Sequence, residues 1–118
     1  MKNVKINLEK LWNDTMLFDD ETKLTKCKYY DVDFFKLLKE MTVGRWIKFI
    51  VVDSIETVEL IKNVSSTFDE NMGWMIYFHS ENYDYKVDVT YNITIYDYKK
   101  GKIAKKLDFY KNAEKFGL

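Results

Sequence analysis

The chain has 118 residues, of which 47% are hydrophobic and 32% are charged, and its net charge at pH 7 is zero. This composition supports one domain with a hydrophobic core and excludes a disordered tail. No run of about 18 apolar residues occurs, which excludes a membrane-spanning helix, and MKNVKINLEK at residues 1–10 lacks the apolar core of a signal peptide. We therefore expect a single cytoplasmic domain over residues 1–118.

Residue usage adds two further expectations. Cys27 is the only cysteine, so an internal disulfide is impossible, in agreement with a reducing compartment. Proline is absent, and residues with AT-rich codons (Asn, Ile, Tyr, Phe and Lys) are abundant. This bias predicts an origin in a low-GC bacterium, its phage or its plasmid.

Charge is unevenly distributed along the chain. Residues 53–97 contain two lysines against nine Asp or Glu, a net charge of −7, whereas residues 98–118 contain seven lysines against two acids, a net charge of +5. The fold can bring these segments together so that they cancel. Alternatively, the acidic segment offers a surface to a basic protein partner. One basic segment in a neutral protein is weak support for nucleic-acid binding, which we do not expect.

Two helices are expected in the first third. Within residues 7–18, Leu8, Leu11, Trp12 and Thr15 share one helical face. An apolar step at 16–18, a polar turn (DDETK) and a short strand at 24–30 follow. Residues 31–41 predict the clearer helix, with Asp31 or Asp33 as N-cap and Gly44 just beyond its end. Its apolar stripe is Phe34, Leu37, Leu38 and Met41.

From Arg45 onward the apolar period becomes that of β-strands. RWIKFIVVD (45–53) is apolar on both faces except at Lys48, which predicts a strand inside a sheet. TVELIKNV (57–64) predicts the next strand, SSTFDENMG (65–73) a polar loop, WMIYFHS (74–80) another strand and ENYD (81–84) a turn.

Residues 85–98 (YKVDVTYNITIYDY) alternate most regularly and predict one continuous strand. Its odd positions, Val87, Val89, Tyr91, Ile93 and Ile95, form the face that should be buried. KKGK (99–102) then predicts a hairpin turn in which Gly101 supplies a positive φ, with KIAKKLDFY (102–110) returning as a strand. A helix over residues 103–116 is the alternative, because Ile103, Leu107 and Tyr110 also fit helical spacing.

This element order predicts an α+β fold. We expect a strongly curved, mostly antiparallel sheet of about five to six strands, with the N-terminal helices packed on its concave face.

The order resembles the nuclear-transport-factor-like superfamily, which includes polyketide-cyclase-like proteins. The resemblance lies in LEKLWNDTMLFDDE (8–21), DVDFFKLLKEM (31–41) and ITIYDYKKGKIAKKLDFY (93–110). It implies a cone-shaped apolar pocket between sheet and helices, and homodimers formed through the outer sheet face. The chain departs from the family because a long first helix has no room before Asn7. A cystatin-like sheet-on-helix fold is the competing assignment, and no catalytic residue can be carried over.

Candidate chemical groups are few. His79, the only histidine, could act as a base if Asp84 or Asp88 oriented it, although a histidine on a sheet surface is the commoner arrangement. With one Cys and one His, no metal site is expected, and no cofactor is expected. Asp53 could be a general base at the rim of a pocket or a turn residue that ends a strand.

Two sets of residues are candidates for binding. The pocket candidates are Trp12, Phe34, Trp46, Asp53, Trp74 and Tyr91, with ordinary core packing as the alternative role for the tryptophans. The interface candidates combine the even positions of 86–96 with the preceding strand: Tyr77, His79, Asp84, Asp88, Thr90, Asn92, Thr94 and Tyr96. This mixture of tyrosine and hydrogen-bonding groups is typical of interfaces.

Two functions are therefore predicted. The first is a homodimeric binding domain that holds a small apolar or aromatic ligand, with no assignable catalysis. The alternative is an inhibitor or immunity-type protein of a phage or other mobile element that binds a protein partner through its acidic, Tyr-rich sheet face. A cavity of several hundred Å³, the size that ligand pockets need, would favour the first.

Overall fold

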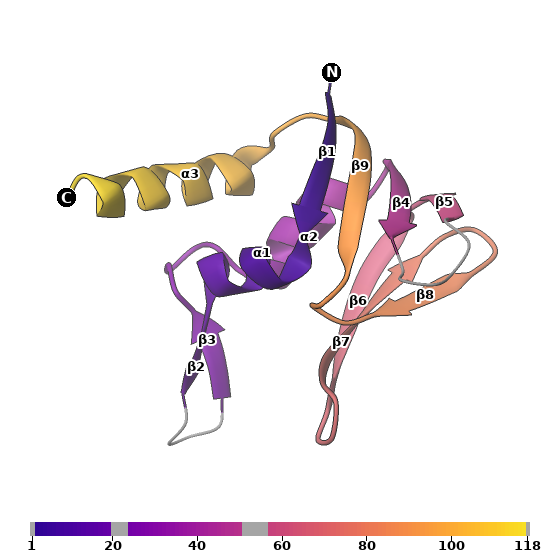
Figure 1. Ribbon diagram of the computed structural model, residues 1–118, viewed down its shortest axis with the longest axis horizontal. Helices are drawn as coiled ribbons and strands as arrows, with labels where there is room; N and C mark the ends of the chain where they lie inside the picture. The colour runs from indigo at the N-terminus through magenta and orange to yellow at the C-terminus, as the bar shows by residue number, and fades with distance from the viewer. Residues whose placement is uncertain (1, 20–23, 51–56, 118) are drawn as a thin grey trace.

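The computed structural model describes residues 2–19, 24–50 and 57–117. Figure 1 shows the elements of these residues in chain order. They are β1 (Lys2–Asn7), α1 (Leu8–Thr15), β2 (Met16–Asp19), β3 (Leu24–Cys27), α2 (Phe34–Thr42), β4 (Trp46–Ile50), β5 (Thr57–Leu60), β6 (Asn63–Asp69), β7 (Gly73–His79), β8 (Asp84–Val87), β9 (Asn92–Tyr98) and α3 (Lys102–Lys115). The α+β class is confirmed.

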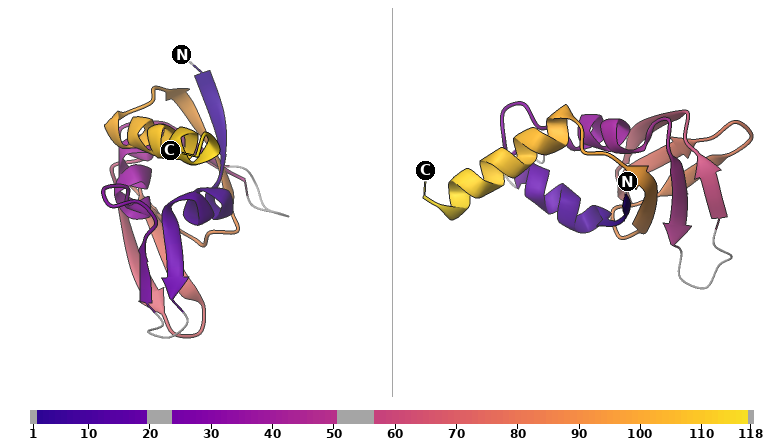
Figure 2. Two further views of the ribbon diagram at one scale, coloured as in Figure 1. Left: turned by 90° about the vertical axis from the view of Figure 1, so that its left-hand side faces the viewer. Right: turned by 90° about the horizontal axis from the view of Figure 1, so that it is seen from above.

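The strands of the described residues form three antiparallel sheets. One has four strands in the order β1-β9-β4-β5, one has three in the order β6-β7-β8, and the third is the pair β2-β3. Figure 2 shows α1 and α3 to one side of the molecule and the two larger sheets to the other. The single curved sheet expected from the sequence is therefore replaced by separate sheets.

Helix α2 forms as its sequence predicts and lies at the centre of the core. Asp33 is the N-cap, and its Oδ1 accepts hydrogen bonds from the backbone N–H groups of Phe35 (2.8 Å) and Lys36 (3.0 Å). The apolar stripe from Phe34 to Met41 is buried. After the helix, Gly44 has a φ of +81° and donates a backbone hydrogen bond to Ile61, which carries the chain into β4.

The two larger sheets face each other across one core. Alternate residues of β4 and β9 point inward from the four-stranded sheet, and those of β6, β7 and β8 point inward from the other: Ile47, Phe49, Ile93, Ile95, Val64, Ile76, Phe78 and Val87. Phe49 packs edge-on against Phe78, with 5.2 Å between ring centroids, and stacks on Tyr85 at 4.9 Å. Ile93 is fully buried and Thr94 is only half-buried, so the predicted register of this strand is confirmed.

The stretch 85–98 is not one strand, however. β8 belongs to the three-stranded sheet and β9 to the four-stranded sheet, and a turn at residues 88–91 separates them. In this turn the backbone N–H of Tyr91 donates to the carbonyl of Asp88 at 3.3 Å. The alternation survives because both sheets turn the same set of side chains toward the shared core. Residues 57–64 are divided in the same way, between β5 and β6.

The strand β2 forms where only an apolar step was expected. Two further stretches of strand were not expected. β6 extends to Asp69, so most of the predicted polar loop at 65–73 is a strand, and β1 pairs with β9. Both are edge strands with one exposed face. Polar residues are tolerated there, so their sequences carry little apolar alternation.

The predicted C-terminal hairpin is wrong, and the helical alternative is right. Gly101 has a φ of −92° and is the N-cap of α3. The carboxylate of Glu40, on α2, accepts hydrogen bonds from the backbone N–H groups of Ile103 (2.9 and 3.0 Å) and Ala104 (3.1 Å). A helix leaves its first N–H groups without internal partners, and a negative charge stabilises that end. Contact with α2 thus favours a helix here.

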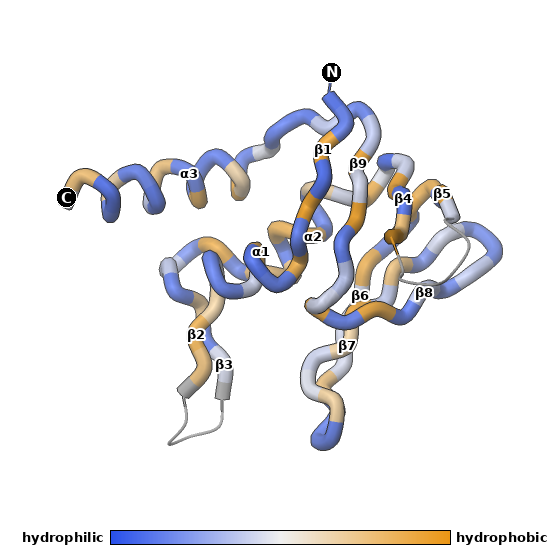
Figure 3. The backbone as a smooth tube through the Cα atoms, viewed as in Figure 1, coloured by the Kyte–Doolittle hydropathy of each residue, from blue (hydrophilic) through white to orange (hydrophobic). Residues whose placement is uncertain are grey.

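Glycine at position 101 is required by space and not by backbone conformation. A Cβ atom there would lie 2.7 Å from Glu40 Cγ, closer than real Cβ contacts allow. Beyond this contact α3 is mostly hydrophilic (Figure 3) and buries only Ala104 and Leu107.

Ile93→Ala should lower the free energy of unfolding by about 2–5 kcal/mol, because it leaves a cavity between Ile6 and Phe49, the partners of Ile93 on the neighbouring strands. Thr94→Ala, one residue along on the outer face, should change it by less than about 0.5 kcal/mol. Urea unfolding of both variants is the measurement. Equal midpoints would contradict the register.

Glu40→Ala and Gly101→Ala should each destabilise the wild type by about 0.5–2 kcal/mol, because each removes the cap of α3. In the Glu40→Ala background, Gly101→Ala should instead raise the free energy of unfolding. Alanine accepts a φ of −92°, and the lower entropy of the unfolded chain then stabilises by about 0.4–1 kcal/mol. Urea unfolding of the four proteins is the measurement. If the destabilisation of the double variant equals the sum of the two single destabilisations, the glycine has a role that does not depend on Glu40.

Candidate functional site

A half-open cavity of about 710 Å³ lies between the strand pair β2-β3 and the hairpin β6-β7. Both pairs extend from the body in the same direction, as the two downward-pointing arms of Figure 1 show. We call this cavity the prong cleft. Its lining residues are Trp12, Phe18, Thr25, Phe68, Met72, Gly73, Trp74, Asp88, Val89 and Thr90.

A continuous row of aromatic rings connects the two sides of the prong cleft. Trp12 on α1 packs edge-on against Phe35 of α2, at 5.9 Å between ring centroids. Phe35 lies 5.1 Å from Trp74 on β7, and Trp74 lies 5.4 Å from Phe68 on β6. Because α2 is fixed in the core, this row holds both tryptophans in place on either side of the cleft.

The arms of the prong cleft carry exposed apolar side chains. Phe18 on β2, Phe68 on β6 and Met72 in the β6-β7 turn are each well over half exposed. Such a group is costly to leave in water, and single-chain proteins keep large apolar patches for binding. The cleft therefore has an apolar rim as well as an apolar wall.

Few polar groups line the prong cleft. Asp88 is the only charged residue among its described lining residues, and its Oδ1 accepts hydrogen bonds from the backbone N–H (2.8 Å) and the hydroxyl of Thr90. Thr25 supplies the remaining side-chain hydroxyl. The site can therefore hold an apolar molecule and offer it one carboxylate.

The structure distributes the predicted pocket residues as follows. Trp12 and Trp74 line the prong cleft, and Phe34 lies fully buried behind Trp12 at 5.0 Å. Trp46 lies on the outer face of the four-stranded sheet, and Tyr91 packs on the core without lining the cleft. Asp53 lies outside the described residues.

Sequence reasoning missed Phe18, Phe68 and Met72. The available signal was their position in the sequence: each is a large apolar residue beside a polar stretch, where burial in the chain's own core is least expected.

The predicted interface residues do not form one face. Tyr77, His79 and Asp84 lie on the three-stranded sheet, whereas Asn92, Thr94 and Tyr96 lie on β9 of the four-stranded sheet. Asp88 and Thr90 lie in the turn between them, beside the prong cleft. The prediction joined them because it treated 85–98 as one strand next to β7.

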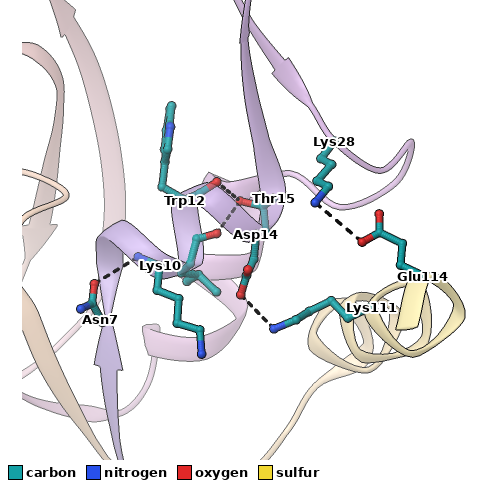
Figure 4. A network of polar contacts seen from close by, with 9 residues as sticks. Asn7, Lys10, Trp12, Asp14, Thr15, Lys28, Lys111 and Glu114 are labelled. Carbon is teal, nitrogen blue, oxygen red and sulfur yellow. Dashed lines mark hydrogen bonds and ion pairs between the residues drawn. The ribbon is translucent and has the colours of Figure 1, made fainter. Parts of the chain in front are cut away.

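A second, polar cavity of about 350 Å³ lies between α1, residues 28–29 and α3. Figure 4 shows its two ion pairs, from Lys111 Nζ to Asp14 Oδ2 (2.9 Å) and from Lys28 Nζ to Glu114 Oε2 (3.7 Å). The buried hydroxyl of Tyr29 has no hydrogen-bond partner among the described residues. Burial and the neighbouring Glu114 carboxylate raise the pKa of Tyr29 to about 12. These contacts dock the far half of α3 on the body.

The same helix is held nearer its middle by Asp31. The hydroxyl of Tyr110 donates to Asp31 Oδ1 at 2.7 Å, and Lys106 Nζ lies 3.0 Å from Asp31 Oδ2. The hydrogen bond from Tyr110, followed by the contact with Lys106, lowers the pKa of the Asp31 carboxyl. Docking of α3 therefore depends on ionised carboxylates.

No protein-family model, curated protein or solved structure matches this chain. Among the described residues, none of the helices has the length and apolar character needed to cross a membrane. The described part of the chain also contains no group of three His, Cys, Asp or Glu side chains placed to hold a metal ion.

The lowered pKa of Asp31 predicts a pH dependence of stability. Because the folded-state pKa lies below the unfolded value, Asp31 stabilises the fold above about pH 4 and loses this contribution as the pH falls. Tyr110→Phe removes the first cause of the shift. Its melting temperature should therefore fall less than that of the wild type between pH 7 and pH 3. The exposed Tyr83→Phe is the matched control and should behave as the wild type; an unchanged pH dependence in Tyr110→Phe would contradict the assignment.

Proposed function

We propose that the protein is a binding module that holds a small, neutral or cationic aromatic ligand in the prong cleft. The observation that carries this proposal is the apolar cavity of about 710 Å³ with a tryptophan on each side. Ligand pockets usually measure about 300–1,000 Å³ and combine apolar walls with a few polar groups. The prong cleft meets both criteria.

The charge of the prong cleft selects among aromatic ligands. Asp88 is the only charged group among its described lining residues, so an anion would meet a like charge and no compensating cation. A cationic group would meet both this carboxylate and the faces of the tryptophan rings, which attract cations. A neutral ring would gain from apolar burial alone.

We assign ligand binding, and no catalysis, to the prong cleft. Its described lining contains no histidine, cysteine or lysine. Asp88 Oδ1 accepts hydrogen bonds from both the backbone N–H and the hydroxyl of Thr90, so this carboxylate serves to hold the turn. The alternative, a protein-binding inhibitor, stays a prediction, because its acidic sheet face is divided between two sheets.

We propose homodimerisation through the outer face of the four-stranded sheet. On this face Thr94 is flanked by Lys5 and Lys48, its partners on the neighbouring strands. Val58 lies opposite Lys48 on the far side, and Trp46 lies two residues along from Lys48. Trp46 and Val58 are among the exposed large apolar residues, which supports an interface centred on β4.

Membership of the nuclear-transport-factor-like superfamily also stays a proposal. The order of α1, the β2-β3 pair and α2 before a series of antiparallel strands supports it. The motif at 93–110, however, forms a strand and a helix instead of the expected hairpin.

N-phenyl-1-naphthylamine, a neutral aromatic dye, should bind the prong cleft. Its 17 heavy atoms at about −0.3 kcal/mol each predict a dissociation constant on the order of 0.1 mM. 8-Anilinonaphthalene-1-sulfonate has the same rings plus a sulfonate, and should bind several-fold more weakly. Asp88→Asn should bring the dissociation constants of the two dyes closer together, because it removes the negative charge that repels the sulfonate. Equal affinities of both dyes for the wild type would contradict the charge argument.

Tryptophan fluorescence can place the dye. In a Trp46→Phe background the remaining tryptophans, Trp12 and Trp74, both line the prong cleft. The neutral dye should quench this emission by energy transfer, and Phe68→Ser should weaken binding at least tenfold while the fold is retained. Phe109→Ser, which changes an equally exposed phenylalanine on α3, is the matched control. The same affinity in Phe68→Ser and Phe109→Ser would exclude the cleft as the site.

Sedimentation at micromolar concentration tests the dimer. The wild type should sediment as a dimer, and Trp46→Lys should sediment as a monomer with an unchanged circular dichroism spectrum, because position 46 lies on the outer face. A monomeric wild type at this concentration would remove the proposed interface.

A further inference from the structure

Three side chains on the three-stranded sheet form a connected hydrogen-bonded relay. Ser65 Oγ lies 2.7 Å from His79 Nε2, and His79 Nδ1 lies 2.6 Å from Asp84 Oδ1. A serine at one imidazole nitrogen and a carboxylate at the other is the arrangement by which a histidine activates a serine nucleophile. We call these three residues the relay.

The register of the sheet places the relay. His79 on β7 lies directly opposite Asp84 on β8, so their side chains share one face. On the other side His79 lies opposite Asn63, and Ser65 is two residues further along β6, in the diagonal position on the same face. Three adjacent strands thus contribute one member each, and the ring of Tyr77 lies nearly parallel to the imidazole at 6.4 Å.

We propose that Ser65 is a nucleophile for acyl transfer from activated carboxylic esters, with His79 as general base and Asp84 as its positioning residue. Ser65 Oγ forms a bond to the ester carbonyl carbon while its proton passes to His79 Nε2. The carbon–oxygen bond to the alcohol then breaks, and His79 returns the proton to the departing oxygen. The product is an acyl ester of Ser65, which water hydrolyses by the same proton transfers.

The solvent exposure of the relay limits the rate enhancement that we expect from it. Solvent reaches 30% of the His79 side chain and 67% of the Asp84 side chain, so the hydrogen bond between them is weaker than a buried one. General-base assistance contributes about 10²–10⁴-fold, and we expect the lower end of this range. This favours substrates with good leaving groups, whose departure needs little proton donation from His79.

The relay is independent of the ligand proposed above. None of its three residues lines the prong cleft. Loss of dye binding in Phe68→Ser should therefore leave the reactivity of Ser65 unchanged, and the two proposals can fail separately.

A fluorophosphonate probe tests the relay on the whole chain, because attack by Ser65 Oγ on phosphorus expels fluoride and marks the residue covalently. Peptide mass spectrometry should locate the label on Ser65. His79→Ala should slow labelling about 100-fold, and free imidazole should restore part of the rate, which it would not do for a purely structural histidine. Asp84→Asn, in which the imidazole remains, should cause a smaller loss.

Ser66 provides the matched control, since it is the next residue on β6 and points to the opposite face. Ser66→Ala should label at the wild-type rate, and Ser65→Ala should carry no label on residue 65. Labelling of Ser65 no faster than of Ser66 in the wild type would overturn the proposal. An undiminished rate in a folded His79→Ala variant would do the same, and if that variant does not fold, an undiminished rate in Asp84→Asn decides against it.

Discussion

One buried face of α2 organises the packing of the other elements. The stripe from Phe34 to Met41 is in the core, and this helix packs against α1, α3, β6 and β9. Phe35, which directly follows the first residue of this stripe, is only partly buried, and its ring lies between Trp12 and Trp74. The helix that fixes the core therefore also fixes the aromatic row of the prong cleft. Stability and ligand binding should be coupled through this element.

Helix α3 depends on α2 in a different way. It buries only Ala104 and Leu107, too little apolar area to hold a 14-residue helix by burial alone. Its position is determined by polar contacts at intervals: the cap from Glu40, the hydrogen bond from Tyr110 to Asp31, and the ion pair from Lys111 to Asp14. Each of these contacts uses a carboxylate from the body of the protein. These three carboxylates lie within residues 1–52, so the contacts of α3 do not test whether the acidic segment 53–97 cancels the basic segment 98–118.

Both proposed sites arise because the strands divide between two sheets. The turn at residues 88–91 takes the chain from β8 to β9 and places Asp88 at the wall of the prong cleft. The same division separates β7 from β9, so that Tyr77 and His79 have β6 and β8 as neighbours. As a result His79 meets Asp84 and Ser65. The outer face of β9 instead continues onto β4 and then β5, which carry Trp46 and Val58. One change in topology therefore converts a single predicted interface into two separate surfaces.

Elements whose signals are local could be predicted from the amino-acid sequence alone. The N-cap at Asp33, the glycine at position 44 and the helical spacing between them predict α2 correctly, and the alternation around Ile93 predicts which side of β9 is buried. These signals succeed because capping and periodicity involve residues only a few positions apart. The prediction that Asp84 or Asp88 could orient His79 was also correct in part, because the structure places Asp84 at the imidazole. Sequence could suggest this pair because the two residues are only five positions apart.

Features that join residues far apart in the chain depend on tertiary contacts and could not be predicted from sequence patterns. Residues 102–115 fit both a strand and a helix, and the choice depends on Glu40, more than 60 residues away. The bend at 88–91 does not interrupt the alternation, because both sheets face one core, so periodicity could not reveal it. Phe18 and Phe68 likewise line one cleft only because the packing of distant elements places their strands on either side of it. Local patterns carry no information about such distances, and the packing of distant elements supplies it.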